Sequence, residues 1–219
     1  MNTQKLNSAI TEFIKKKKSN AAYYEENWAE RKERKEYYQS FTKDKLLAMT
    51  EEEFLEYISK LWSMLIWGNK KYVVDKMIAD NGFVTLKKQL AELLYSTNPI
   101  EKRWDVFLKS IKGMGPATIS ELLTYANPQE YVIFNKTTIL CYGYLDITDM
   151  PKYNYQSPER SMLKYVLLQK ISQQNSKKPV KMIMIFWLWI ILCGMKFYPL
   201  PKRSLPYLLL PLKSRNLLP

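Results

Sequence analysis

The chain has 219 residues, of which 47% are apolar and 14% aromatic, a composition typical of a folded protein with one ordinary core or two small ones. It contains no histidine and only two cysteines, Cys141 and Cys193, which lie far apart. These counts exclude Ser-His and Cys-His catalysis, histidine-type zinc sites and a four-cysteine iron–sulfur cluster.

The formal net charge of +13 is unevenly distributed. Eight basic residues and no acidic ones follow from Lys177 to the end, so residues 1–176 carry only about +5. This mild excess is compatible with a nucleic-acid partner but does not require one. Residues 1–18 lack the apolar core of a signal peptide, and two unclustered cysteines suit a reducing compartment. We therefore expect a cytoplasmic protein that does not bind a membrane.

The spacing of apolar residues predicts helices throughout the first 173 residues. The lysine run 15–18 is more typical of a solvated helix face than of a phosphate contact. Thr50 and Glu53 form a capping-box signature, and the pair Asn81-Gly82 suits a break between two helices. The expected helices are at about 2–39 (one or two helices), 51–62, 70–80, 83–95, 100–111, 116–126, 136–145 and 158–173.

Two signals refine the second half of this pattern. Asn98 and Pro99 predict a helix start, with the asparagine as cap and the proline in the first turn. Residues 131–134 read as a short extended piece before Asn135. No segment shows convincing strand alternation, so the fold class is expected to be all-α, a helical bundle. Its divisions are expected to be a charged N-terminal segment at 1–45, a helical domain at 46–176 and an aberrant tail at 177–219.

The segment IKGMGPATIS, residues 111–120, joins two of these helices through a turn with two glycines. Gly113 and Gly115 can each take a positive φ angle, and neither has a side chain to hold a ligand away from the backbone. The second helix begins at Pro116, so the amides of Ala117 and Thr118 in its first turn lack intrahelical acceptors. Such a helix start accepts a phosphate oxygen without any charged side chain.

Neighbouring residues complete this candidate site. Ile111 and Met114 are expected to pack the two helices together, because they are the apolar members of the turn. Lys112, Lys109 and Lys136 are expected to supply positive charge near the bound phosphate.

The segment KGMGPATISELL resembles the helix-hairpin-helix motif of DNA repair proteins, whose usual form is PGVGxxTAxxxL. The positions that match in register are Gly113, Met114, Gly115 and Thr118, and the final leucine of the motif falls at Leu123, next to Leu122. Lys112 replaces the usual proline, and Ile119 replaces the alanine. The resemblance implies a glycosylase-like helical arrangement and non-specific binding of double-stranded DNA through its phosphates. A monovalent cation bound by the carbonyls of the turn would also fit this family, and no other cofactor or metal is expected.

The resemblance extends to the positions where glycosylases of this superfamily carry their catalytic residues. Asn135 falls where the catalytic aspartate would stand, and an amide cannot do the work of that carboxylate. Ala117 occupies the position where the lyase members place a lysine. We therefore expect a catalytically silent module. Two alternatives stay open: a base-excision glycosylase that uses Asp146 or Asp149 as its acid, and a helical scaffold that binds another protein.

Residues from about Trp62 to Leu145 also resemble a helical module of prokaryotic restriction and defence proteins, through WGNKKYVVDKMIADNGF, the hairpin and PQEYVIFN. In those proteins the module precedes a restriction motor or a modified-base-binding domain. The resemblance implies that this chain is an accessory part of a larger protein, with a C-terminal domain or partner that is missing.

The tail from Lys181 changes character, because it has no acid and an apolar run of about fourteen residues. That run is shorter than the roughly twenty residues that span a bilayer. When the possible codons of this tail are read in the frame that starts one base earlier, they can encode (N/D)DYDFLALDYFVWYEIL, an amphipathic sequence with acidic residues. We therefore expect that a single base was lost near the Lys181 codon, and that the tail is out-of-frame sequence.

Overall fold

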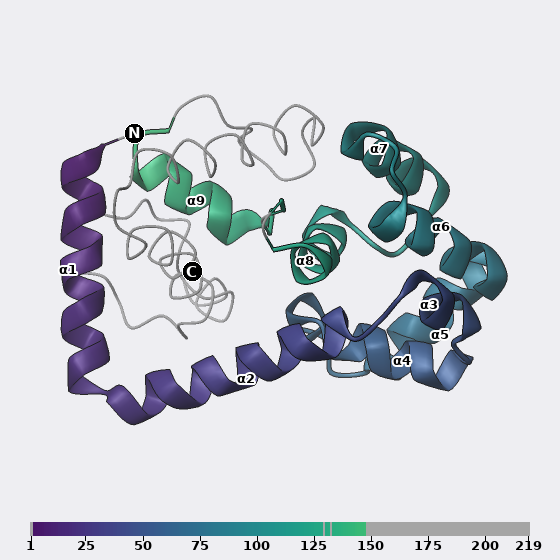
Figure 1. Cartoon of the computed structure of the whole chain (residues 1–219), viewed down its shortest axis with the longest axis horizontal. Helices are drawn as coiled ribbons and strands as arrows, with labels where there is room; N and C mark the ends of the chain where they lie inside the picture. Colours follow the sequence, from purple (N-terminus) through teal and green to yellow (C-terminus); the bar gives the residue numbers. More distant parts are fainter. Residues whose placement is uncertain (1, 129, 132, 148–219) are drawn as a thin grey trace, which may run out of the picture.

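A computed structural model describes residues 2–128, 130–131 and 133–147 (Figure 1). Every regular element in these ranges is helical, which confirms the all-α expectation for this part of the chain. The elements are α1 (Thr3–Ser19), α2 (Ala21–Gln39), α3 (Lys43–Ala48), α4 (Glu51–Ser59), the short 3-10 helix η1 (Trp62–Met64), α5 (Lys70–Asn81), α6 (Phe83–Tyr95), α7 (Ile100–Ser110), α8 (Pro116–Ala126) and α9 (Lys136–Tyr144). The helix expected at 158–173 and the tail from 177 lie outside the described residues.

Two local signals act as expected, one at the start of α4 and one between α5 and α6. Thr50 Oγ1 accepts from the amide of Glu53 at 3.2 Å, and the Glu53 carboxylate accepts from the amide of Thr50 at 2.8 Å, which completes the capping box. Gly82 adopts φ 75°, and this left-handed residue separates α5 from α6.

Two expected helix boundaries are wrong. Asn98 does not cap α7: Pro99 is the N-cap, and the Asn98 amide instead donates to the Ser96 hydroxyl at 3.2 Å. The helix expected at 51–62 ends at Ser59, whose carbonyl accepts from Lys70 Nζ at 3.2 Å. The amide of Trp62 donates to the carboxylate of Glu121, which is distant in sequence. The hydrogen bonds that would continue α4 are therefore not formed.

One hydrophobic core joins α2 through α8. Helix α6 lies at its centre, because α3, α5, α7 and α8 all pack against it. The fully buried side chains with the largest volumes include Trp104, Tyr57, Phe54 and Phe107. Tyr38 of α2 belongs to the same core and stacks on Tyr125 of α8, so the expected segment 1–45 contributes to the core of the helical domain.

Helix α1 differs from the others because it buries no residue. It meets α2 at a corner after Ser19, where the rings of Phe13 and Tyr24 are in contact (Figure 1). The start of α1 is tied to the end of α9, where the Asn2 amide donates to the Leu145 carbonyl at 2.7 Å. Figure 1 shows α1 at one side and α2 leading from it toward α3, α4 and α5, with α8 and α9 across from α2.

Candidate nucleic-acid interface

The turn between α7 and α8 lies at the surface of the molecule. Ile111 and Met114 are buried in the core, which confirms the packing expected of them. Lys112, Gly113 and Gly115 are exposed. The apolar residues thus anchor the turn while the intervening backbone faces solvent.

The two glycines of the turn have different conformations. Gly113 adopts φ 87°, and a Cβ there would lie 2.9 Å from Cγ of Met77 on α5, so both the backbone and the packing require glycine. Gly115 adopts φ −91° and ψ 178°, so of the two glycines only Gly113 uses the positive φ that both could take. A Cβ at Gly115 would have no heavy atom within 4 Å, so this position is open to solvent.

The start of α8 offers unpaired backbone donors. Gly115 is the N-cap and brings no side-chain acceptor, and Pro116 follows it as the first helical residue. The amide of Ile119 donates to the Gly115 carbonyl at 3.1 Å. Within the described residues the amides of Ala117 and Thr118 have no acceptor, which is the arrangement expected of an anion-binding helix start.

The turn is held from behind by the last residue of α5. Asn81 Oδ1 accepts from the amide of Lys112 at 2.8 Å, and Asn81 Nδ2 donates to the Lys112 carbonyl at 2.9 Å. The same Nδ2 donates to the Met77 carbonyl at 2.7 Å. The Lys112 carbonyl, one of those that could bind the expected monovalent cation, therefore already accepts a hydrogen bond. Sequence reasoning assigned Asn81 only to a helix break and missed this role.

The three lysines expected at the site are all exposed. Lys109 lies on the last turn of α7, with its Nζ 3.7 Å from a carboxylate oxygen of Asp105. Lys136 is the first residue of α9. It is brought toward α8 by the preceding segment, because the Phe134 amide donates to the Ser120 hydroxyl at 2.8 Å.

Asn135 is the N-cap of α9. Its Oδ1 accepts from the amide of Thr138 at 2.9 Å and from the Thr138 hydroxyl at 3.1 Å. The side chain at the position of the glycosylase aspartate is thus part of a helix cap.

Asp146, the first alternative acid, lies beyond the other end of α9, about 15 Å away at a rise of about 1.5 Å per residue. Its carboxylate accepts from Lys5 Nζ at 2.7 Å and from Asn2 Nδ2 at 2.9 Å. These hydrogen bonds lower the pKa of Asp146, so the group is ionised and engaged near neutral pH. Asp149, the second alternative, lies outside the described residues.

A buried carboxylate connects α8 to η1 and was missed from the sequence. Glu121 accepts from the amide of Trp62 at 2.6 Å and from the amide of Ser63 at 2.9 Å. Burial raises the pKa of Glu121, while these amides and Arg34 act in the opposite direction. The only sequence signal was a charged residue inside the apolar stripe of α8.

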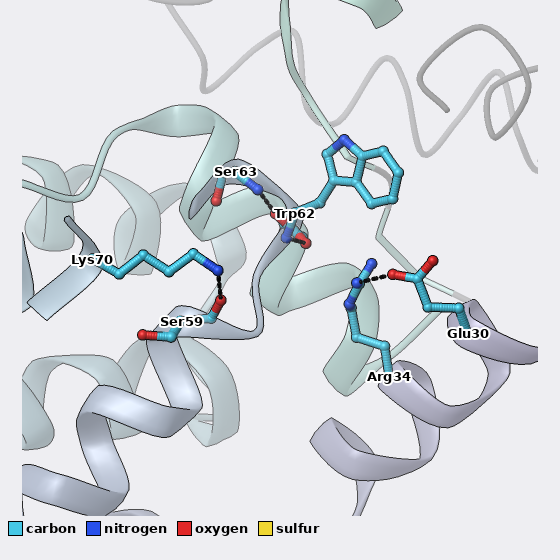
Figure 2. A network of polar contacts seen from close by, with 7 residues as sticks. Glu30, Arg34, Ser59, Trp62, Ser63 and Lys70 are labelled. Carbon is cyan, nitrogen blue, oxygen red and sulfur yellow. Dashed lines mark hydrogen bonds and ion pairs between the residues drawn. The ribbon is translucent and has the colours of Figure 1, made fainter. Parts of the chain in front are cut away.

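Figure 2 shows the polar groups around η1. Arg34 of α2 pairs with Glu30 at 2.5 Å, and its guanidinium lies over the Trp62 ring, 5.4 Å from the ring centroid. These contacts, together with the Glu121 carboxylate, join α2, η1 and α8 into one unit. They therefore fix the loop that follows η1.

Comparison of the chain with protein-family models, curated proteins and solved structures finds no match. In the described ranges, no group of three or more cysteine, aspartate and glutamate side chains is arranged to hold a metal ion. No helix there is both long and apolar enough to cross a membrane. The function must therefore be inferred from the geometry of the turn.

Proposed function

We propose that this chain is a non-catalytic, helix-hairpin-helix DNA-binding module that holds a phosphate of double-stranded DNA at the turn between α7 and α8. The observation that carries the proposal is the open start of α8, where the amides of Ala117 and Thr118 lie next to a glycine that leaves the approach clear. A phosphate oxygen bound there would interact with these donors and with the positive end of the helix dipole.

The surroundings of the turn suit a backbone contact. The bonds from Asn81 preorganise the turn, so little conformational entropy is lost when the phosphate binds. Lys109, Lys112 and Lys136 add positive charge without a fixed geometry for reading bases. Binding through these groups would be sequence-independent.

The absence of catalysis in this proposal follows from two positions. Asn135 uses its side-chain oxygen to cap α9, and Ala117 has no group that could attack a sugar. The resemblance to restriction and defence proteins supports a role as the DNA-binding part of a larger repair or restriction protein.

The test is a titration of a labelled duplex of about 20 base pairs with the full chain at several salt concentrations. We expect affinity to fall linearly with salt on logarithmic axes, and the slope to decrease by about one in Lys112→Gln. Gly115→Leu should weaken binding at least about tenfold, because its side chain would cover the amides at the start of α8. Its helical circular dichroism should be unchanged, because nothing lies within 4 Å of the new Cβ.

Gly143→Leu is the matched control, because Gly143 is also exposed and a Cβ there also meets nothing within 4 Å. This variant should bind DNA like the wild type. Equal loss in both variants, or none in Gly115→Leu, would rule out a phosphate contact at the turn. A wild-type chain that binds no duplex at any salt concentration would favour the protein-scaffold alternative.

A further inference from the structure

The loop between η1 and α5 exposes a row of large apolar side chains. The exposed fractions are 49% for Leu65, 81% for Ile66, 50% for Trp67 and 63% for Tyr72 in the first turn of α5. Isolated exposed apolar residues are common, but four within eight positions form a patch of the kind that marks an interaction site.

The loop that exposes these side chains is held in place at both of its ends. Met64 is buried in the core directly before the patch, and the Trp67 amide donates to its carbonyl at 3.2 Å. The base of the loop is fixed by Glu121, and its end is fixed by Asn69, whose side chain caps α5 by accepting from the Tyr72 amide at 3.0 Å. The aromatic rings of Trp67 and Tyr72 are therefore displayed from an ordered backbone.

The lysines of this region lie at the surface. Residues 60–76 contain four lysines and one acid. Three of the lysines, Lys60, Lys71 and Lys76, lie in exposed ion pairs with Glu56, Asp75 and Asp80. Exposed ion pairs are weak, so a phosphate can compete with these carboxylates for the lysines. Lys71 and Lys76 lie on the same helix as Tyr72. Aromatic rings interleaved with lysines suit single-stranded nucleic acid, in which bases stack on the rings while the cations contact the backbone.

Helix α5 sets the distance between this patch and the turn. Asn81, at the end of α5, is hydrogen-bonded to Lys112 in the turn between α7 and α8. Tyr72 lies at the other end of α5, in the first turn of that helix. From Lys70 to Asn81 the helix rises about 17 Å at about 1.5 Å per residue. That length corresponds to about five nucleotides at about 3.4 Å per base. One DNA molecule can thus reach from the turn to the patch.

We propose that Trp67 and Tyr72 stack on unpaired bases of a DNA strand whose duplex part is held at the turn between α7 and α8. This inference rests on the proposed function and specifies its substrate as duplex DNA that continues into a single strand. Leu65 and Ile66 provide apolar contact beside the stacked bases.

The experiment compares a blunt duplex with the same duplex carrying a single-stranded extension of about eight nucleotides, titrated with the full chain. The wild type should bind the extended duplex about tenfold more tightly, which corresponds to about 1.4 kcal/mol. The double variant Trp67→Ala/Tyr72→Ala should lose this preference and still bind the blunt duplex within about twofold of the wild type. Tyr144→Ala, which removes an exposed ring on α9, is the control and should keep the preference.

Each other outcome is decisive. Equal wild-type affinity for the two DNAs, with Gly115→Leu still weakening both, would overturn the stacking proposal and leave the proposed function intact. If the wild type does not bind the blunt duplex, a titration with the single strand alone separates the two proposals. Binding of the single strand that is abolished in Trp67→Ala/Tyr72→Ala would support the stacking proposal. No binding of the single strand would refute the stacking proposal. A wild-type dimer that becomes a monomer in Trp67→Ala, measured by light scattering, would show that a second copy covers the patch and would also refute it.

Discussion

Gly113 and Gly115 lie two residues apart in one turn, yet the structure uses them differently. Gly113 combines a positive φ with a close approach to Met77, whereas Gly115 has an ordinary extended backbone and open space around it. The pattern of two glycines predicted an exposed turn correctly, but it could not show which of the two glycines the fold requires. Part of the answer is the contact between Gly113 and Met77 of α5, which is distant in sequence.

A pair of alanine substitutions tests this distinction. Gly113→Ala should destabilise the fold by about 2 kcal/mol, because alanine is strained at φ 87° and its Cβ would contact Met77. Gly115→Ala should cost less than about 1 kcal/mol, because its backbone angles are accessible to alanine. Urea denaturation followed by circular dichroism measures both values. A larger cost at Gly115 than at Gly113 would contradict the assignment.

At the scale of helices, the sequence predicted correctly the features that depend on residues close together in the chain. The bounds of α5 and α6 agree with expectation to within a residue, because apolar spacing and Gly82 define them without reference to distant residues. The capping box at Thr50 is equally local, since its two partners are three residues apart. The burial of Ile111 and Met114 followed from the same apolar pattern.

Interactions between distant residues account for what the sequence could not predict. The early end of α4 depends on Glu121, which is 59 residues from Trp62 in the chain. The position of the turn depends on Asn81, 31 residues from Lys112. Neither partner can be chosen from spacing alone, because the pairing exists only after α5 and α8 have packed around the core.

The contact between α5 and the turn can be tested by substitution. Asn81→Ala should destabilise the fold by about 1–2 kcal/mol and accelerate hydrogen exchange at the Lys112 amide, because both bonds to Lys112 are lost. Asn81→Asp should have an intermediate effect, since it keeps an acceptor for the Lys112 amide but loses the donor to its carbonyl. Denaturation and amide exchange at Lys112 measure the effects. Wild-type values in Asn81→Ala would show that packing alone holds the turn.

At the scale of the whole molecule, the described helices fall into a packed group and a peripheral arm. Helices α3 to α8 and the end of α2 share one core, whereas α1 buries no residue. The peripheral arm is α1. Its start is connected to the end of α9, because Asn2 is hydrogen-bonded to Leu145 and Asp146, and Lys5 forms an ion pair with Asp146 (Figure 1). Elements with few buried contacts open first, so stability should differ between these two parts.

Native-state hydrogen exchange measures this difference. We expect the amides of α1 to exchange through local opening, and the central amides of α6, around the buried Leu86 and Leu90, to exchange only through global unfolding. Asp146→Asn should accelerate exchange in α1, because it removes the ion pair with Lys5, and should leave α6 unchanged. The pKa of Asp146 is lowered in the folded protein, so the ionised carboxylate stabilises the attachment of α1. This stabilisation should be complete above pH 3.8, the ordinary pKa of the group, and should be lost as the pH falls through the lower pKa of the folded state. Equal protection of α1 and α6 in the wild type would instead show that the arm and the core unfold as one cooperative unit.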